Sequence, residues 1–248
     1  MRITRLYTQQ VLRQGTTLQL APEQAHYLAN VLRAQSGDSV RLFNDGDEEY
    51  EARLIKLSKK QAKLELLSVI PGKRESPLQL NVAIGIARGA HMDLAIQKAV
   101  ELGVTCIIPL ITEYSNVKIK PDRIQNKMTH WSNIIISATE QCGRTRLAKI
   151  AQPIRLDEFL IGEAEGQRLL FHPEAETTIA ELDGKPDNVT LLIGPEGGFS
   201  EDEVTLAIQH GCQTLYLGPR VLRAETAVVA AVACCQGQWG DLFSLPDK

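Results

Sequence analysis

The chain has 248 residues, of which 44% are apolar and 23% charged, and this composition excludes a disordered tail, a fibrous repeat and a coiled coil. The longest unbroken apolar run, residues 227–235, is shorter than the about 20 residues that cross a bilayer. The first fifteen residues lack the apolar core of a secretory signal. Five cysteines without a Cys-x-x-Cys pair fit reduced thiols. We therefore expect a cytoplasmic protein of one large or two modest domains, with neither a membrane span nor a metal site.

The net charge of −3 conceals an uneven distribution along the chain. Residues 1–150 carry a net charge of +7, whereas residues 151–248 carry −10. Such segregation is typical of a protein whose basic part contacts a polyanion. It is equally typical of an unevenly charged but merely solvated surface, and charge alone does not separate these two interpretations.

Residues 1–72 are predicted to form a small β-rich domain. Alternating apolar residues predict strands over residues 39–43, 51–55 and 61–67, and Asn44-Asp-Gly46 is a hairpin signal between the first two. Pro22 suits the first turn of a helix over residues 22–34. Residues 71–77 contain two prolines and a glycine and are predicted to be the linker.

Strands and helices alternate after this linker. Strands are expected over residues 78–86, 104–110, 169–171, 189–193 and 214–217. Helices are expected over residues 91–102, 122–142, 200–210 and 227–235. This alternation predicts an α/β domain with a mostly parallel sheet covered on both faces.

The loop Gly194-Pro-Glu-Gly-Gly-Phe-Ser200 joins a buried strand to a helix that Ser200 and Glu203 start as a capping box. Its three glycines allow positive φ and close approach of the backbone to a ligand. It matches neither the dinucleotide motif nor the P-loop, and the carboxylates at the helix start disfavour a phosphate. The loop is therefore either a binding loop for a neutral or cationic ligand or a tight turn with a structural role.

A second strand ends in Gly218-Pro and continues as Arg220-Val-Leu-Arg-Ala-Glu-Thr-Ala227. Arg220 and Arg223 are candidates for contact with RNA phosphate, or they simply pair with Glu225 and Glu196. The small residues that follow favour helix packing over a cofactor motif. His172, just after an earlier strand, is a candidate general base or a wall residue of a pocket.

These motifs together resemble a known family. The pair GPEGGFS and LGPRVLRAETA resembles the SPOUT class of methyltransferases, and more closely the RsmE family, which methylates N3 of a uridine in 16S ribosomal RNA. Residues 1–7, 26–33, 44–46, 98–103 and 140–144 resemble further stretches of this family, although Leu6 stands where an aromatic residue is more usual. Ribose-methylating relatives typically carry an SLN-type segment where this chain has residues 223–226, which favours base methylation.

The resemblance implies a PUA-like RNA-binding β-barrel domain over residues 1–72 and a SPOUT methyltransferase domain with a C-terminal trefoil knot over residues 73–248. It also implies a homodimer and S-adenosyl-L-methionine (SAM) as cofactor. The implied cofactor-binding residues are Phe171, His172, Pro173, Leu192, Ile193, Gly194, Pro195, Glu196, Gly197, Leu217, Gly218, Val221, Leu222, Thr226 and Ala227.

For catalysis we expect Arg223 to stabilise the uracil anion and Glu225 or Glu140 to accept the N3 proton. The candidate RNA-binding residues are Arg2, Arg5, Arg33, Lys118, Lys120, Arg123, Arg144, Arg146 and Arg220. The expected partners are 16S rRNA, in the small ribosomal subunit, and a second copy of the chain. Two other functions stay open: an RNA-binding ribosome assembly factor without turnover, and a SPOUT enzyme that methylates another RNA position.

Overall fold

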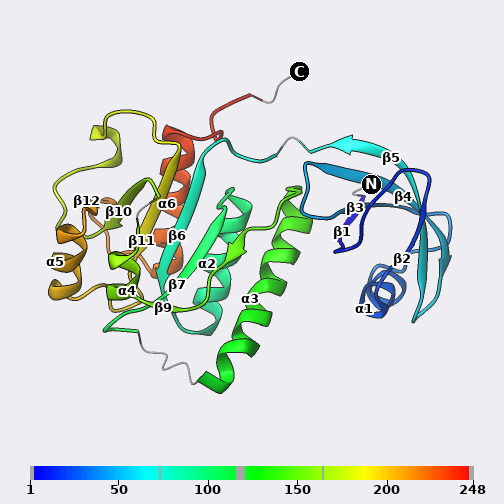
Figure 1. Ribbon diagram of the computed structural model, residues 1–248, viewed down its shortest axis with the longest axis horizontal. Coiled ribbons are helices and arrows are strands. Elements are labelled where there is room, and N and C mark those ends of the chain that lie inside the picture. The colour runs from blue at the N-terminus through cyan, green and yellow to red at the C-terminus, as the bar shows by residue number, and fades with distance from the viewer. Residues whose placement is uncertain (1–2, 73, 116–120, 164, 246–248) are drawn as a thin grey trace. The chain divides into compact units, whose positions relative to one another are not determined.

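The computed structural model describes residues 3–72, 74–115, 121–163 and 165–245 (Figure 1). The chain divides into two compact units. The first consists of residues 1–75 and 139–147, and the second of residues 76–138 and 148–248. Among the described residues, no helix is both long and apolar enough to cross a membrane.

The first unit contains a five-stranded sheet with the order β1-β3-β4-β5-β2. Strand β1 pairs with β3 in parallel, and all other pairs are antiparallel. The strands are β1 (Thr4–Tyr7), β2 (Thr17–Gln19), β3 (Ser39–Phe43), β4 (Glu48–Leu57) and β5 (Ala62–Pro71). Helix α1 (Pro22–His26) continues directly into a π-helical turn, η1 (Tyr27–Val31). The predicted hairpin between β3 and β4 is confirmed, with Asp45 at a positive φ of 66° in its turn.

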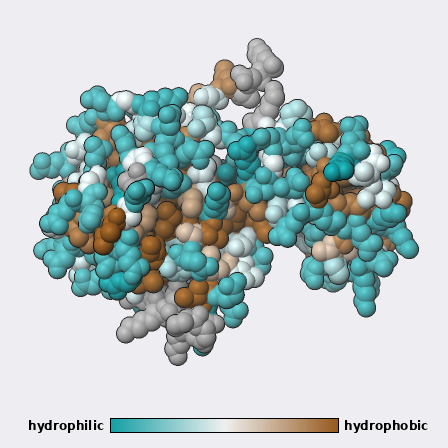
Figure 2. Space-filling model, viewed as in Figure 1, coloured by the Kyte–Doolittle hydropathy of each residue, from teal (hydrophilic) through white to brown (hydrophobic). Residues whose placement is uncertain are grey.

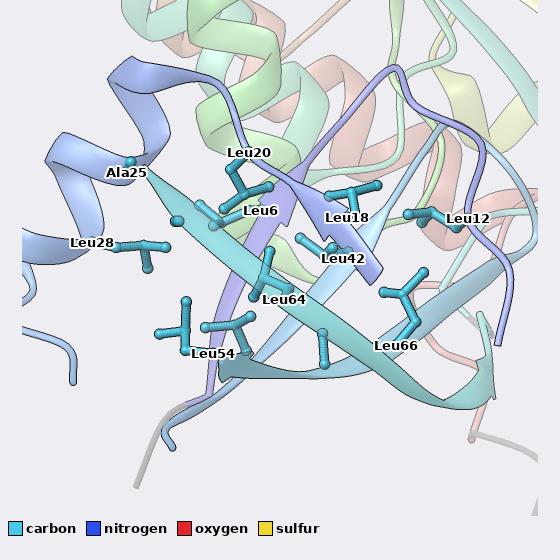
Figure 3. Packing of buried hydrophobic residues seen from close by; sticks show 13 residues of the cluster. Leu6, Leu12, Leu18, Leu20, Ala25, Leu28, Leu42, Leu54, Leu64 and Leu66 are labelled. Atoms are coloured by element: carbon cyan, nitrogen blue, oxygen red, sulfur yellow. The ribbon is translucent and has the colours of Figure 1, made fainter. Parts of the chain in front are cut away.

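Leucines fill the core of this unit (Figure 3). Alternate residues of β4 and β5, including Leu54, Leu64 and Leu66, point to the same side of the sheet as Leu42 of β3, and all four are at most 1% exposed. Ala25 and Leu28 add the apolar side of the helical segment to this cluster. Burial of each such side chain contributes about 1.5–3 kcal/mol, so the period-2 pattern of the strands sets the register.

Residues 139–147 join the first unit through hydrogen bonds to charged side chains. Arg5 donates to the carbonyl oxygens of Thr139 and Arg144 at 2.9 and 2.7 Å, and it also forms an ion pair of 2.7 Å with Glu49. The guanidinium of Arg144 is buried and pairs with Glu75 at 2.8 Å. Each of these charges is paired and hydrogen-bonded, which is the condition for keeping it out of water.

The second unit contains a parallel sheet with the order β12-β10-β11-β6-β7-β8, to which β9 adds by pairing with β7. Every strand pair in it is parallel, as predicted. The strands are β6 (Gln79–Gly85), β7 (Cys106–Ile111), β8 (Lys149–Ile150), β9 (Ile154–Arg155), β10 (Gln167–Phe171), β11 (Asn188–Ile193) and β12 (Gln213–Leu215).

Helices cover both faces of this sheet (Figure 1). Helices α4 (Leu156–Ile161) and α5 (Glu201–Gln209) pack on the face that contains Ala83, Leu170 and Leu192. Successive residues of a strand point to opposite faces, so the residues next to Ala83, Leu170 and Leu192 in sequence lie on the other face. Helix α6 (Ala224–Gln238) packs on β11 on that face and against α2 (Gly89–Glu101). The remaining helices are α3 (Pro121–Cys142) and a 3-10 turn, η2 (Ile179–Glu181).

The five strands and four helices expected after the linker are all present. Helix α6 begins three residues earlier than predicted, at Ala224, because Arg223 rather than a later residue takes the N-cap position. Strands β1, β2, β8 and β9, helix α4 and η2 were not predicted, since each has six residues or fewer and shows too little periodicity.

Candidate functional site

The described part of the chain contains a pocket of about 320 Å³ where three neighbouring strands of the second unit end. Strands β11, β10 and β12 lie side by side and run in the same direction, so the loops that follow them meet at one edge of the sheet. This is the edge at which open α/β sheets bind ligands. The lining comes from residues 171–173, 193–199, 217–218 and 220–222, together with Ala224 and Ala227 of α6.

The loop after β11 is held in a compact form by its glycines. A Cβ on Gly194 would lie 2.8 Å from the backbone of Gly198, and one on Gly197 would lie 2.8 Å from Cβ of Tyr114. Of the three glycines that we expected to adopt positive φ, only Gly198 does so, with a φ of 73°. Gly194 and Gly197 are therefore needed for close approach of neighbouring atoms rather than for their backbone angles.

Carboxylates tie the same loop to adjacent segments. The backbone N–H of Arg88 donates to Glu196 at 2.9 Å, and that of Glu113 donates to Glu203 at 2.8 Å. Glu203 also completes the predicted capping box with Ser200, which is confirmed at the start of α5. Two of the acidic residues that disfavour a phosphate here are thus hydrogen-bonded to backbone donors.

The loop after β12 leads to the N-terminus of α6. Arg223 is the N-cap residue and is exposed, whereas Glu225, in the first turn, is buried. His91 of α2 donates from Nδ1 to Oε1 of Glu225 at 2.9 Å, and the other carboxylate oxygen is buried with no partner among the described residues. Burial acts to raise the pKa of Glu225, but hydrogen bonds from its own backbone N–H and from His91, with the charge of Arg223, lower this pKa overall.

Sequence reasoning did not identify His91 as a partner of Glu225. The signal was its position just after β6, at the same edge of the sheet as the pocket loops. The alternative pairing that we considered, of Arg220 and Arg223 with Glu196 and Glu225, is not seen among the ion pairs of the described residues.

The pocket brings together most residues that the resemblance implied for the cofactor. All of them line it except Leu192 and Thr226. His172 is among the lining residues, and its Nδ1 accepts a hydrogen bond of 3.3 Å from the backbone N–H of Glu174. The lining also includes Gly198, Phe199, Arg220 and Ala224.

Comparison with known proteins matches both units. The model of an RNA methyltransferase domain matches residues 74–236, and that of an RNA methyltransferase PUA domain matches residues 20–67. The ribosomal RNA small subunit methyltransferase E of Buchnera aphidicola is 36% identical over 97% of this chain and 98% of its own length. The chain belongs to the ribosomal RNA small subunit methyltransferase E family.

Solved structures agree with this membership. The family member from Neisseria gonorrhoeae, solved bound to S-adenosylmethionine, is 33% identical, with a TM-score of 0.90 over 97% of this chain and 99% of that one. A Legionella pneumophila protein described as a methyltransferase, solved in complex with SAM, is 42% identical, with a TM-score of 0.94 over 98% and 100% of the two chains. The α/β SPOUT fold with an N-terminal PUA domain is thus confirmed.

Glu140, the other candidate base, lies in the first unit. Its Oε1 accepts a hydrogen bond of 2.9 Å from the backbone N–H of Tyr7. Burial raises the pKa of Glu140, although this hydrogen bond and the charge of Arg5 partly oppose the shift.

The candidate RNA-binding residues differ in their availability. Arg5 and the buried Arg144 are engaged in the contacts described above, and Arg146 pairs with Asp47. Arg33, Arg123 and Arg220 are exposed. Arg2, Lys118 and Lys120 lie outside the described residues.

The buried carboxyl of Glu140 has a structural role that can be tested by stability measurements alone. Glu140→Gln keeps an oxygen for the Tyr7 N–H, so we expect a folded protein; Glu140→Ala leaves that donor unpaired and should cost about 1–3 kcal/mol. Since the folded-state pKa is raised, the favourable contribution of Glu140 is present below the unfolded-state value and is lost as the pH rises through the folded-state value. Unfolding free energies measured from pH 4 to pH 8 should therefore show wild type losing stability relative to Glu140→Gln with rising pH. If the difference in unfolding free energy between wild type and Glu140→Gln stayed constant with pH, the raised pKa of Glu140 would be contradicted.

Proposed function

We propose that the protein transfers a methyl group from SAM to N3 of a uridine in the 16S rRNA of the small ribosomal subunit. The observation that carries the proposal is the pocket at the ends of β10, β11 and β12, which is lined by both motif loops. Relatives at 33% and 42% identity were solved with this cofactor bound. Incubation of the full chain with labelled SAM and 16S rRNA tests the proposal, and binding of both ligands without transfer would favour an assembly factor instead.

The pocket residues fit SAM in size and in chemistry. A volume of about 320 Å³ lies within the range of about 300–1,000 Å³ that is usual for small-molecule sites. The compact loop around Gly194 lines the pocket, and its backbone N–H and C=O groups are the proposed hydrogen-bond partners of the adenine and ribose. Glu196 is a lining carboxylate and suits a ligand with positive charge. When bound, SAM supplies a methyl group already activated by its sulfonium.

The chain's own residues have to remove a proton and stabilise an anion. N3 of uracil attacks only after its proton leaves, and the negative charge then spreads to O2 and O4. A guanidinium at position 223 can donate two parallel hydrogen bonds to such an oxygen. Its exposed position at the N-cap of α6, beside the pocket lining, supports Arg223 as the anion-stabilising group.

The proton acceptor is proposed to be Glu225 or Glu140. Glu225 is close in sequence to Arg223 and has one carboxylate oxygen without a described partner, but its lowered pKa makes it a weaker base. Glu140 has the raised pKa that suits a base at neutral pH, but its hydrogen bond to Tyr7 serves the first unit. Loss of methyl transfer in a stable Glu140→Gln protein would select Glu140.

We also propose that the protein acts as a homodimer. Helix α6 is apolar nearly all round: Val228, Ala231, Val232 and Cys235 are buried, and Ala230 and Ala233 on other sides are only partly covered. A helix of this kind is normally covered on all sides. A second copy packed on α6 would provide the cover and bring further groups to the pocket, and the predicted trefoil knot would hold α6 in place. Light scattering should give twice the chain mass of 27.4 kDa.

The cofactor assignment predicts what happens when a side-chain methyl group is added to the loop at Gly194. In Gly194→Ala the new Cβ meets the backbone of Gly198, so the loop must open and SAM affinity should fall about tenfold or more. Gly46→Ala is the matched control, because its Cβ meets nothing closer than 3.5 Å. Calorimetric titration of both folded variants with SAM makes the comparison, and equal affinities would remove the loop from the cofactor site.

The role of Arg223 predicts a kinetic signature. Arg223→Ala should lower the single-turnover rate by roughly 10²–10³-fold, as loss of one oxyanion donor does, with SAM affinity unchanged. Arg223→Lys should recover part of the rate, because a point charge lacks the fork. Arg220→Ala is the comparison, at a second exposed arginine of the same loop. A wild-type single-turnover rate in Arg223→Ala, at saturating RNA and SAM, would rule out the catalytic role.

A further inference from the structure

One end of the first unit carries cations that form no ion pair with the residues that the structure describes. Arg53, Lys56, Lys59, Lys60 and Lys63 all lie in the hairpin of β4 and β5 and are exposed. Residues 53–63 contain no aspartate or glutamate, and none of the five cations forms an ion pair with a described residue. Lys56 and Lys63 are directly opposite each other in the strand register, a like-charge pairing that is unfavourable on its own.

The helical segment covers residues 22–31, three residues fewer than the predicted 22–34, and hydrogen bonds on either side of it hold it beside this hairpin. Before it, the N–H of Leu20 donates to the carbonyl of Ala62 at 2.9 Å. After it, the N–H of Gly37 donates to the carbonyl of Leu54 at 2.7 Å. Figure 1 shows α1 next to the turn of this hairpin, and Figure 2 shows mostly hydrophilic residues over the same end of the unit.

The helical segment and the residues just after it carry an exposed aromatic ring and a further exposed cation. Tyr27 is 42% exposed and Val31 60% exposed, and neither belongs to the leucine core. Arg33 follows the segment at a φ of 53°, and the N–H of Ala34 donates a hydrogen bond to the carbonyl of Leu28. Glycine usually takes such a left-handed position after a helix end, so Arg33 adopts a backbone conformation that is unfavourable for a residue with a side chain.

We propose that this surface, defined by Lys56, Lys59, Lys60, Lys63, Tyr27 and Arg33, binds an unpaired RNA strand of the substrate. The four lysines and Arg33 would contact phosphates, and the ring of Tyr27 would stack on a base. This inference rests on the proposed function, since it assigns the substrate's docking surface. A membrane-binding hairpin would carry apolar residues at its tip, whereas this tip reads Ser58-Lys-Lys-Gln61.

The RNA contacts would thus come from residues other than Arg5 and Arg144, which are engaged within the unit. The small net charge of residues 1–72 does not reveal the surface, because the acidic residues of this segment lie outside residues 53–63.

The test compares two pairs of substitutions in the full chain. Lys59→Gln/Lys60→Gln lies in a turn whose hydrogen bonds are made by Ser58 and Gln61, so the fold should be kept. Lys149→Gln/Lys185→Gln removes the same charge from exposed positions of the second unit. Binding of a 16S rRNA transcript is titrated between 50 and 200 mM salt. Log affinity falls with log salt, and each lost phosphate contact should make this slope less steep by about 0.7 for a single strand.

We expect the hairpin pair to lower the slope by about 1.4, and the control pair to leave it unchanged. Addition of Lys56→Gln and Lys63→Gln should bring the loss to about 2.8. Tyr27→Ala should weaken binding about tenfold, and Tyr27→Phe should not, because stacking needs only the ring. Equal effects of the two pairs would show a general charge effect and overturn the proposal, as would unchanged binding in the quadruple variant.

Methyl transfer distinguishes failure of this proposal from failure of the proposed function. The quadruple variant should show a raised KM for rRNA and unchanged SAM affinity. If wild type binds the transcript but transfers no methyl group, the proposed function fails. The titrations then still test whether this surface binds RNA. If wild type transfers the methyl group and the quadruple variant has a wild-type KM, only the surface is wrong.

Discussion

The parallel pairing of β10 with β11 and β12 is the constraint on which the pocket depends. Leu170 is in register with Leu192 on one side and with Thr214 on the other, so the three strands end within about two residues of one another along the sheet. Three loops then start side by side at one edge. A shift of one residue in any strand would turn its buried face towards the wrong layer of helices, so the leucine core of the sheet also fixes the geometry of the pocket.

Fixed polar contacts surround the pocket and reduce the freedom of its loops. Glu196 and Glu203 accept hydrogen bonds from backbone N–H groups that follow β6 and β7. Glu225, at the start of α6, likewise accepts a hydrogen bond, from the side chain of His91. The acidic side chains at the start of α5 therefore hold the loop in place as well as suiting the helix dipole. A loop that is already ordered loses less entropy when a ligand binds, which favours affinity for a small cofactor.

The local features of the fold could be predicted, and the long-range contacts could not. The capping box at Ser200, the turn at Asn44-Asp-Gly46 and the glycine-rich strand end at Gly194 each depend on a few adjacent residues. In contrast, Arg5 and Glu140 meet segments 133 or more residues away, and His91 and Glu225 are 134 residues apart. No period or motif marks such pairs. The lysines of the β4–β5 hairpin are plain in the sequence, but only the fold places the helical segment that begins at Pro22 beside this hairpin.

The chemical identity of the product tests the central claim most directly. After reaction of the full chain with SAM and 16S rRNA, nucleoside digestion and mass spectrometry locate the methyl group. The proposed action of Arg223 on a uracil anion predicts a methyl group on N3 of uridine and none on ribose. A 2′-O-methyl nucleoside, or a methyl group on a different base, would contradict it.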